Sequence, residues 1–516
     1  MNIVIRADAA VQIGSGHIMR CLVLAKELTN QGYSVSFACR RQPGDLIGLI
    51  QRRGLSVVEL ASPVINEVNL TPNVAVESNA EADYAASWLG VSWQQDADSL
   101  LAQIKDVDLL IVDHYGINIE WEQYVRNVLD CKLFIIDDLL RLHAADLLLD
   151  QTPMREDSAY VLQSTIKRVL AGSDYALLAD NFAPIRETIM HRHVTTVQPR
   201  VLITMGAMDL PNATGKVLEA FLQLPADDRP QITVLLGQHA PHYQVVKKYI
   251  KVLGNKAKHF DYVENMAEIM VQHDLAIGAA GTTALERACL GLPSILIPLA
   301  DNQRAICNNL VAANAAIYLE LDEITTKLTV QYAFLTANLT EFRARNLVLC
   351  DGLGVKRVLV ELNGLLSYLP STLGLRKATH DDIEQVYNWQ IQPQTRQYSP
   401  NPQSPSWLEH QVWMQNQLSN AEHFFYLIID NVSNLNLGVV RLNRIAQCEY
   451  VISIFIDPSY YGQKIATRAL AIIDIIHRDV TIHARVMQDN SASQQLFTSA
   501  NYQQVTSEIF IRAPIK

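Results

Sequence analysis

The 516-residue chain has no apolar run long enough to cross a membrane. Stretches such as SILIPLA are far shorter than the roughly 20 residues that a membrane helix requires. The first apolar residues are interrupted by Arg6 and Asp8, so the pattern of a secretory signal is missing. We therefore expect a cytoplasmic protein with no membrane partner.

Cysteine and positive charge are also scarce. The seven cysteines are odd in number, widely spaced and include no CxxC pair, which predicts neither a zinc site nor a disulfide framework. Lysine and arginine number 42 against 53 aspartates and glutamates, which gives a net charge of −11. Such a surface repels nucleic acid, and no basic patch interrupts it. We expect no metal and no nucleic-acid partner.

What the sequence does contain is two series of strand and helix patterns. Over residues 1–180, short apolar runs such as NIVIRAD, SVSFACR and DLLIVDHYG alternate with longer amphipathic stretches. Residues 198–365 repeat this pattern with RVLITMGAMD, QITVLLG, LAIGAAG and SILIPLAD. Buried strands that alternate with helices are typical of parallel sheets. We predict an α/β fold with two Rossmann-like domains, and a cleft at the carboxyl ends of their strands.

The last part of the chain, residues 372–516, has a different pattern. FFYLIID, LGVVRLNRI and EYVISIFIDP are typical of successive antiparallel strands, and the helical stretch GQKIATRALAIIDIIH follows them. Strands in series followed by a helix predict a third domain of the α+β class.

The loop GSGH, residues 14–17, joins the first predicted strand to the first helix. Its glycines give a ligand room beside the free N–H groups of the helix start. A dinucleotide fingerprint would need a third glycine where Met19 stands and an acid after the second strand, so nicotinamide binding is disfavoured. His17 is a candidate general base because imidazole titrates near neutral pH; the alternative is a simple hydrogen bond to a loop carbonyl. Its place at the cleft, near Asp8, favours the base.

Two further loops follow strands of the first series. DHYG contains Asp113, His114 and Tyr115, and IDDL contains Asp137 and Asp138. Such side chains face the ligand in open α/β sheets, and the alternative is a solvated turn. The paired carboxylates of IDDL lack the histidine motif of a metal site, so we expect them to form hydrogen bonds within the cleft.

The second series contains an ordered set of polar positions. GAAGTTALE puts Gly281 and Thr282 at a helix start, where free N–H groups and the helix dipole attract a diphosphate. Glu286 is suited to accept hydrogen bonds from ribose hydroxyls, and Asn302 and Gln303 follow the next strand. Each of these residues alone could be a helix cap. In this order they predict a nucleotide-sugar site.

These motifs carry a resemblance that extends over residues 1–355. RADAAVQIGSGHIMRCLVLA, VDHYGI, IDDL, LLDQ, GAMD, GTTALERACLGLP and DNQ resemble those of the UDP-sugar hydrolases of pseudaminic acid biosynthesis, the PseG-like enzymes, which have the GT-B fold. The resemblance implies cleavage of UDP-2,4-diacetamido-2,4,6-trideoxy-beta-L-altropyranose at the anomeric C–O bond with inversion. It implies that His17 activates the water and that no cofactor takes part.

The resemblance, together with the position of the motifs at the predicted cleft, gives the candidate substrate residues. Those for UDP are Gly206, Asp209, Gly281, Thr282 and Glu286. Those for the sugar are Asp8, Gly14, Gly16, Arg20, Asp113, His114, Tyr115, Asn302 and Gln303. A UDP-dependent glycosyltransferase, which shares this fold, and a nucleotide-sugar sensor without turnover are the alternatives.

The region from about residue 375 onward resembles the GNAT acetyltransferases in FIDPSYYGQKIATRAL and DNSASQQLFTSANY. The matching type acetylates the 4-amino group of the UDP-sugar one step before hydrolysis. The implied acetyl-CoA residues are Ile456, Gly462, Lys464, Ile465, Ala466 and Asn490.

Three departures from the GNAT pattern leave two interpretations open. Tyr461 replaces a basic or amide residue, and Lys464 stands at the central glycine of the pyrophosphate turn. Phe497 replaces the usual tyrosine acid, while Tyr502 is out of register. The region is either an acetyl-CoA-dependent N-acetyltransferase or a degenerate domain that binds a partner or a CoA ligand.

Overall fold

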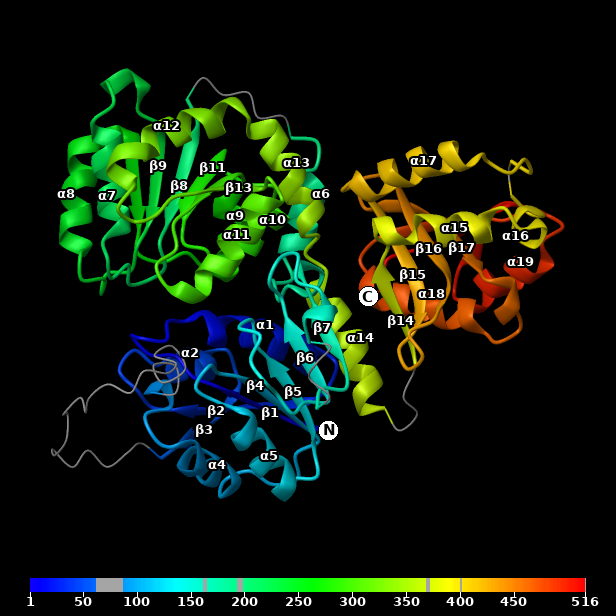
Figure 1. Cartoon of the computed structure of the whole chain (residues 1–516), viewed down its shortest axis with the longest axis horizontal. Helices are drawn as coiled ribbons and strands as arrows, with labels where there is room; N and C mark the ends of the chain where they lie inside the picture. Colours follow the sequence, from blue (N-terminus) through cyan, green and yellow to red (C-terminus); the bar gives the residue numbers. More distant parts are fainter. Residues whose placement is uncertain (62–86, 161–164, 193–197, 368–371, 400, 516) are drawn as a thin grey trace. The chain divides into compact units, whose positions relative to one another are not determined.

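The computed structural model describes residues 1–61, 87–160, 165–192, 198–367, 372–399 and 401–515 (Figure 1). The chain divides into two compact units. The first unit comprises residues 1–186 and 192–355, and the second comprises residues 187–191 and 356–516. The predicted limits of the three domains remain predictions.

The first sheet of the first unit is entirely parallel, with the strand order β3-β2-β1-β4-β5-β6-β7. Its strands are β1 (Asn2–Ala7), β2 (Ser34–Arg40), β3 (Ser56–Leu60), β4 (Leu109–Asp113), β5 (Lys132–Ile136), β6 (Leu147–Asp150) and β7 (Val169–Ala171). Its helices include α1 (Gly16–Asn30), α2 (Ile47–Arg52), α4 (Trp93–Leu101) and α5 (Ile119–Val128). The apolar runs LLIVD and LLLD are buried throughout because helices cover both faces of such a sheet.

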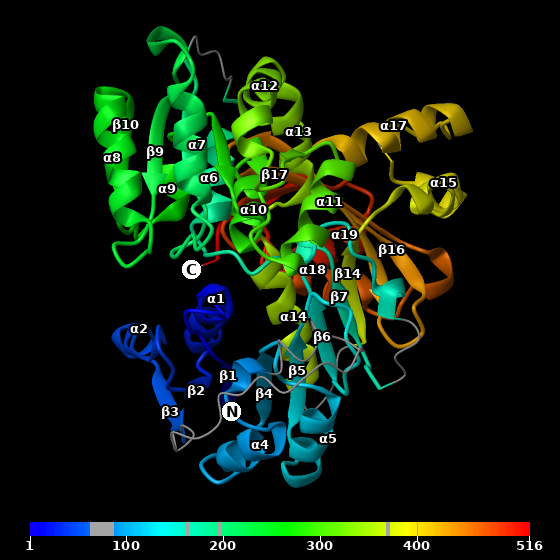
Figure 2. The same cartoon turned by 60° about the vertical axis from the view of Figure 1, so that its left-hand side comes forward.

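The helices that flank this sheet divide between its two faces. Helices α4 and α5 pack on one face through Leu100, Trp121 and Val125, and Figures 1 and 2 show α1 on the other side. The order of the strands reverses between β1 and β4. In open parallel sheets this reversal is the point where the loops diverge and a ligand binds.

The second sheet repeats this plan in the order β10-β9-β8-β11-β12-β13, and all its pairs are parallel. Its strands are β8 (Arg200–Thr204), β9 (Gln231–Leu235), β10 (Ala257–Phe260), β11 (Leu275–Gly278), β12 (Ser294–Leu296) and β13 (Ala316–Tyr318). The helices are α6 (Phe182–Ile189), α7 (Ala213–Leu222), α8 (Tyr243–Leu253), α9 (Met266–Met270), α10 (Thr282–Cys289), α11 (Arg304–Ala312), α12 (Ile324–Ala337) and α13 (Leu339–Leu349). Side chains of α7, α8 and α12 share one apolar core with β8, β9 and β11.

The third sheet lies in the second unit and is mixed, in the order β14-β15-β16-β17-β18-β20-β19. Its strands are β14 (Leu373–Lys377), β15 (His423–Asp430), β16 (Asn436–Ala446), β17 (Glu449–Ile456), β18 (Thr481–Arg485), β19 (Gln503–Gln504) and β20 (Ile509–Arg512). The helices are α14 (Gly354–Leu366), α15 (Ile383–Gln390), α16 (Pro393–Arg396), α17 (Trp407–Ser419), α18 (Ile465–Ile476) and α19 (Ser491–Ser499). Helices α15 and α17 lie side by side against β15 and β16 (Figure 2).

The pairing of β17 with β18 differs from that of the strands before it. The two strands are parallel and pair only from Glu449 with Thr481 to Ile452 with Ala484, although β17 continues to Ile456. The remaining pairs from β14 to β17 are antiparallel, as the sequence predicted. Together the three sheets confirm the predicted class, with two Rossmann-like folds followed by an α+β fold.

Candidate functional site

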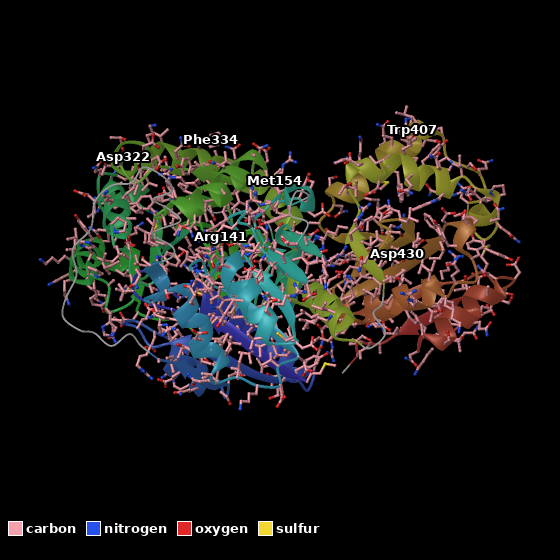
Figure 3. All side chains as sticks on the ribbon, turned by 60° about the horizontal axis from the view of Figure 1, so that its bottom comes forward. Arg141, Met154, Asp322, Phe334, Trp407 and Asp430 are labelled. Atoms are coloured by element: carbon pink, nitrogen blue, oxygen red, sulfur yellow. The ribbon has the colours of Figure 1, made fainter. Side chains whose placement is uncertain are left out.

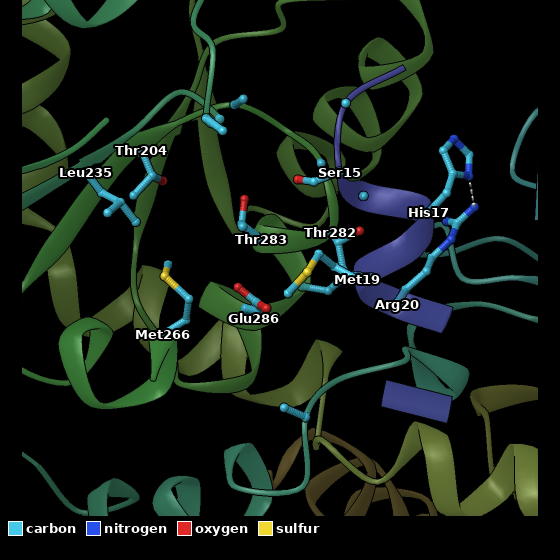
Figure 4. Close-up of a pocket in the computed structure, with 18 of the residues that line it drawn as sticks. Ser15, His17, Met19, Arg20, Thr204, Leu235, Met266, Thr282, Thr283 and Glu286 are labelled. Atoms are coloured by element: carbon cyan, nitrogen blue, oxygen red, sulfur yellow. Dashed lines mark hydrogen bonds between the residues drawn. The ribbon is translucent and has the colours of Figure 1, made fainter. Parts of the chain in front are cut away.

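A cavity of about 2500 Å³ lies within the first unit, lined by loops at the carboxyl ends of both parallel sheets. Figure 4 shows His17, Met19 and Arg20 on α1, and Thr282, Thr283 and Glu286 on α10 among its lining residues. The cavity therefore joins the GSGH loop of the first series to the GTT helix of the second. This is the cleft that the sequence predicted from two Rossmann-like halves.

The two glycines of the GSGH loop leave open space at this cavity. Gly14 has a φ of +80°, which L side chains rarely adopt, and its N–H donates to the Ala10 carbonyl at 2.8 Å. A Cβ added at Gly14 or Gly16 would meet no heavy atom within 4 Å. The turn thus requires glycine at position 14, and both positions line the cavity as predicted.

His17 is held by a carboxylate beneath the cavity wall. Its Nδ1 lies 2.5 Å from Asp113 Oδ1, at the end of the neighbouring strand β4. A carboxylate of this kind can only accept, so the geometry puts the imidazole proton on Nδ1. Arg20 Nη2 lies farther from the same nitrogen, at 3.4 Å. Among the described residues, His17 Nε2 makes no hydrogen bond, which leaves its lone pair available at the cavity.

Arg20 completes this arrangement from one turn later on α1. Its Nε and Nη2 donate to the two oxygens of Asp113, each at 2.6 Å. Burial alone would raise the pKa of the Asp113 carboxyl, but the Arg20 guanidinium and His17 hold that pKa well below its usual range. Asp113 therefore stays ionised and fixes the ring of His17.

A second acid, Asp138, connects this group to Tyr115. Asp138 accepts from Arg20 Nη1 at 3.2 Å and from the Tyr115 hydroxyl, and the Tyr115 ring lies 4.6 Å from the ring of His17. Arg141, labelled in Figure 3, lies 5.6 Å from the centre of the Tyr115 ring. It also binds Asp137 at 2.5 Å, so the IDDL carboxylates hold Tyr115 in place.

Asp8 and His114 lie below the surface of the cavity, although the sequence predicted that they would contact the sugar. Both are buried and neither lines the cavity. Asp8 accepts from the Arg40 N–H at 2.7 Å and from Arg6 at 2.9 Å, and His114 Nε2 lies 3.3 Å from it. Burial lowers the pKa of His114. These two residues support the β1 and β4 ends, and their contact with a sugar remains a prediction.

In the second half of the cavity, Gly281 and Thr282 begin helix α10 and Glu286 follows one turn later. The Glu286 Oε2 atom is buried and has no hydrogen-bond partner among the described residues. Burial raises the pKa of Glu286 to about 7. A carboxylate left without a partner at a cavity wall is suited to accept from a ligand hydroxyl.

The other predicted UDP and sugar residues take mixed positions. Gly206 lines the cavity with a φ of +78°. Asp209 also reaches it, but its two oxygens accept from the N–H groups of Ala213 and Thr214 at 2.8 Å, so it caps helix α7. Asn302 and Gln303 line the cavity, and the Gln303 side chain accepts from the Leu299 N–H at 3.0 Å.

Two cavity residues were not predicted from the sequence. Trp88 lies 6.4 Å from the His17 ring and 5.6 Å from the Tyr115 ring, measured between ring centroids. Arg155 lines the cavity and pairs with Asp150 at 2.7 Å. Trp88 lies in the turn that Gly90 closes, and Arg155 lies beyond the end of β6. Neither residue follows a predicted strand directly, so the predicted strand and helix pattern gave no signal for them.

In the second unit the predicted acetyl-CoA residues surround the start of α18. Gly462 has a φ of +80°, and the exposed Lys464 precedes the helix with a φ of +57°. Ile456 ends β17, where the ladder with β18 has already stopped. Asn490 accepts from the Ser493 N–H at 3.1 Å, which caps α19. Phe497 and Tyr502 are both buried and lie 5.0 Å apart, so neither is an open acid.

Comparison with known proteins agrees with this division. Residues 201–344 match the glycosyltransferase family 28 C-terminal domain, and residues 372–503 match the acetyltransferase (GNAT) domain. The UDP-2,4-diacetamido-2,4,6-trideoxy-beta-L-altropyranose hydrolase of Campylobacter jejuni is 28% identical over 291 residues, which cover 56% of this chain and 89% of that protein. The chain joins a PseG-like region to a GNAT domain. The names PseG-like region and GNAT domain are used below for residues 1–355 and 372–516.

Two other relatives differ in how much of the chain they match. The spore coat polysaccharide biosynthesis protein SpsG of Bacillus subtilis is 25% identical over 242 residues, covering 46% of this chain and 70% of that protein. An uncharacterized protein of Methanocaldococcus jannaschii is 22% identical over 525 residues, covering 97% of this chain and 96% of that protein. This second match spans both the PseG-like region and the GNAT domain.

Among solved structures, the crystal structure of MurG from Acinetobacter baumannii aligns with a TM-score of 0.47 and 16% identity, covering 69% of this chain and 98% of that chain. The spermidine N-acetyltransferase of Vibrio cholerae aligns with a TM-score of 0.25 and 20% identity, covering 28% of this chain and 90% of that chain. No helix within the described residues is long and apolar enough to span a membrane.

Proposed function

We propose that the PseG-like region hydrolyses UDP-2,4-diacetamido-2,4,6-trideoxy-beta-L-altropyranose to UDP and the free sugar. The observation that carries this proposal is the orientation of His17. Its Nδ1 is bound to Asp113 at 2.5 Å, and its Nε2 has no partner among the described residues. A water molecule at Nε2 would lie in the same cavity as the start of α10.

In the proposed reaction His17 Nε2 takes a proton from water as the water oxygen forms a bond to the anomeric carbon. The bond from that carbon to the diphosphate oxygen breaks, and UDP leaves with the electron pair. Attack from the face opposite the leaving group inverts the anomeric configuration. A positioned base contributes about 10²- to 10⁴-fold to such a rate. UDP is already a good leaving group, so the reaction needs no dedicated acid.

The leaving diphosphate is proposed to bind at Gly281 and Thr282, where the first N–H groups of α10 are free to donate. Those donors stabilise the charge that develops as the C–O bond breaks. Glu286 is suited to accept from the ribose hydroxyls, and Asn302 and Tyr115 are proposed to contact the sugar. The UDP-sugar is therefore the proposed small-molecule partner of this region.

The direct test is to incubate the chain with the authentic UDP-sugar and follow UDP and the sugar anomer by NMR. We expect UDP and the inverted free sugar without any added acceptor. A UDP-dependent glycosyltransferase, to which the family 28 match also points, would leave the substrate intact until an acceptor is added. Unchanged substrate would therefore contradict the hydrolase proposal.

The variant His17→Asn tests the proposed base. Turnover should fall at least about 100-fold, while the affinity for UDP stays within about threefold because UDP is proposed to bind at the other half. His239→Asn is the matched control, since His239 is exposed and does not line the cavity. Retained turnover in His17→Asn would contradict the role of the base.

We also propose that the GNAT domain transfers an acetyl group from acetyl-CoA to the 4-amino group of the UDP-amino sugar. The amine nitrogen forms a bond to the acetyl carbon, the thioester bond breaks, and CoA leaves as its thiol. The support is the match of residues 372–503, together with the turn at Gly462 before α18. Acetyl-CoA titrated into the full chain should bind and be consumed only when the amino sugar is present; no binding would favour a degenerate domain.

A further inference from the structure

Arg287 is a buried arginine at the back of the α10 start. It is 1% exposed and extends from α10 toward the ends of β8 and β11. Its Nη2 donates to the Ala279 carbonyl at 2.8 Å, and its Nη1 lies 3.3 Å from Thr204 Oγ1 and 3.4 Å from Thr283 Oγ1. The three groups that hold it are thus neutral oxygens.

No carboxylate forms an ion pair with Arg287 among the described residues. Its Nε is buried without a hydrogen-bond partner, and burial lowers the pKa of Arg287 to about 10. Glu286, the adjacent residue in the chain, acts on it only at longer range. A buried charge costs free energy unless an opposite charge accompanies it, so this position calls for an anion.

The fold makes room for this guanidinium. A Cβ added at Gly278, the last residue of β11, would come within 2.7 Å of both Arg287 Nη1 and the Thr204 carbonyl oxygen, and within 2.9 Å of Thr204 Oγ1. Real Cβ atoms do not approach other atoms this closely, so glycine is required there. The guanidinium thus packs directly against the backbone of β8 and β11 at the point where Gly278 has no side chain.

The side chains that hold Arg287 also face the cavity. Thr204 and Thr283 both line it, and Figure 4 shows them on the side of the cavity where α10 begins. Ala279, which accepts from Nη2, directly precedes the Ala280–Gly281 turn at the start of the helix. The positive charge therefore lies one layer behind the free N–H groups of the first turn of α10.

We propose that the diphosphate of the bound nucleotide is the counter-ion of Arg287, and that this arginine sets the affinity for phosphate relative to nucleoside. The inference rests on the proposed function, because it uses the same UDP site. Arg287 acts through Thr204, Thr283 and the helix start, and so it is a positioning residue that also supplies a fixed charge. The helix dipole and the guanidinium then act in the same direction on the ligand.

The test compares UDP with uridine, which differ only in the diphosphate. Each ligand is titrated calorimetrically into the full chain, and the ratio of the two affinities is the readout. In Arg287→Gln, which removes the charge, the ratio should fall about tenfold, the scale of an attraction between opposite charges separated by one layer of side chains. Arg287→Lys keeps the charge but loses the forked geometry. Its ratio of UDP affinity to uridine affinity should be at least a third of that of the unaltered chain.

Arg343→Gln is the matched control. Arg343 is a second buried arginine, and its Nη1 donates to the carbonyls of Leu290 and Gly291 at the opposite end of α10. Its loss should lower stability but leave the affinity ratio unchanged. An unchanged affinity ratio in Arg287→Gln would overturn this inference, as would an equal fall in the ratio in Arg343→Gln. Neither result would affect the proposed function. Failure of the unaltered chain to bind UDP would overturn the proposed function as well.

Discussion

His17 and Asp113 are separated by 96 residues of sequence and joined by a contact of 2.5 Å between Nδ1 and Oδ1. The contact exists because β1, which precedes the loop of His17, pairs with β4, which ends at Asp113. The sheet therefore fixes which nitrogen of His17 faces the protein and which faces the cavity.

The variant Asp113→Asn should reduce turnover of the UDP-sugar by about 10²- to 10⁴-fold. An asparagine amide has only one oxygen that can accept hydrogen bonds. It therefore cannot accept from His17 Nδ1 and from both Arg20 nitrogens, and the imidazole loses its fixed orientation. The measurement is turnover by NMR beside the affinity for UDP, which should change less than about threefold. Asp98→Asn is a surface control, since Asp98 accepts from Tyr124 in an exposed pair. Turnover within threefold of the unaltered chain would contradict this prediction.

The variant Glu286→Gln should stabilise the free protein above neutral pH. Burial raises the pKa of Glu286 from 4.5 to about 7, so its contribution to stability is present below about pH 4.5 and is lost as the pH rises through 7. The neutral amide avoids that loss, which amounts to about 3 kcal/mol at pH 8. The difference between the variant and the unaltered chain in denaturant titrations should therefore be small at pH 5 and much larger at pH 8, and the variant should bind UDP more weakly. A constant difference across both pH values would rule out the charge as its cause.

His143 should make the stability of the PseG-like region fall in alkaline solution. Burial opposes its charged form, but Asp137 at 3.3 Å and Glu122 at 2.6 Å raise the pKa of His143 to about 9. Its stabilisation is complete below pH 6.5 and is lost as the pH rises through 9, by up to about 3 kcal/mol.

The variant His143→Gln provides the check on that dependence. It should be less stable than the unaltered chain at pH 6 and should approach it by pH 10, as followed by denaturant unfolding. A difference in stability that does not change with pH would contradict the raised pKa of His143.

Two variants, Lys464→Gly and Lys464→Asn, distinguish the effect of backbone strain on stability from the effect of the lysine charge on acetyl-CoA binding in the GNAT domain. Lys464 has a φ of +57°, a conformation that costs about 1 kcal/mol for a side chain with a Cβ and is free for glycine. Lys464→Gly should therefore raise the unfolding free energy by about that amount. If the ammonium contacts the pyrophosphate of acetyl-CoA, both variants should bind acetyl-CoA a few-fold more weakly and bind pantetheine unchanged. Weaker binding in only one of them would argue against the charge.

The sequence predicted the parallel sheets well because their strands are buried on both faces and alternate with helices. It also predicted which loops reach the cavity, since the carboxyl ends of parallel strands converge there. His17, Tyr115 and Glu286 were identified in this way. What could not be predicted was the depth of Asp8 and His114, because side-chain direction at a strand end depends on the path of the following loop.

The sequence also could not predict which residues pair with each charged side chain. The pairing of Arg20 with Asp113 requires the adjacency of β1 and β4, which no local pattern encodes. Asp209 appeared in the sequence as a ligand residue after a strand, yet its oxygens cap α7. Arg287 was not identified from the sequence, and only the fold shows that it packs against Gly278 and Thr204 behind the start of α10.

The two parallel sheets share one strand order, with the reversal between β1 and β4 in the first and between β8 and β11 in the second. The proposed base follows the first strand of one copy, and the proposed phosphate helix follows the corresponding fourth strand of the other. Under the proposed function, the first parallel sheet carries the reacting loop and the second carries the helix that binds the nucleotide. In that case a change in the loop after β1 would alter the reaction at the sugar and leave the nucleotide site of the second sheet intact.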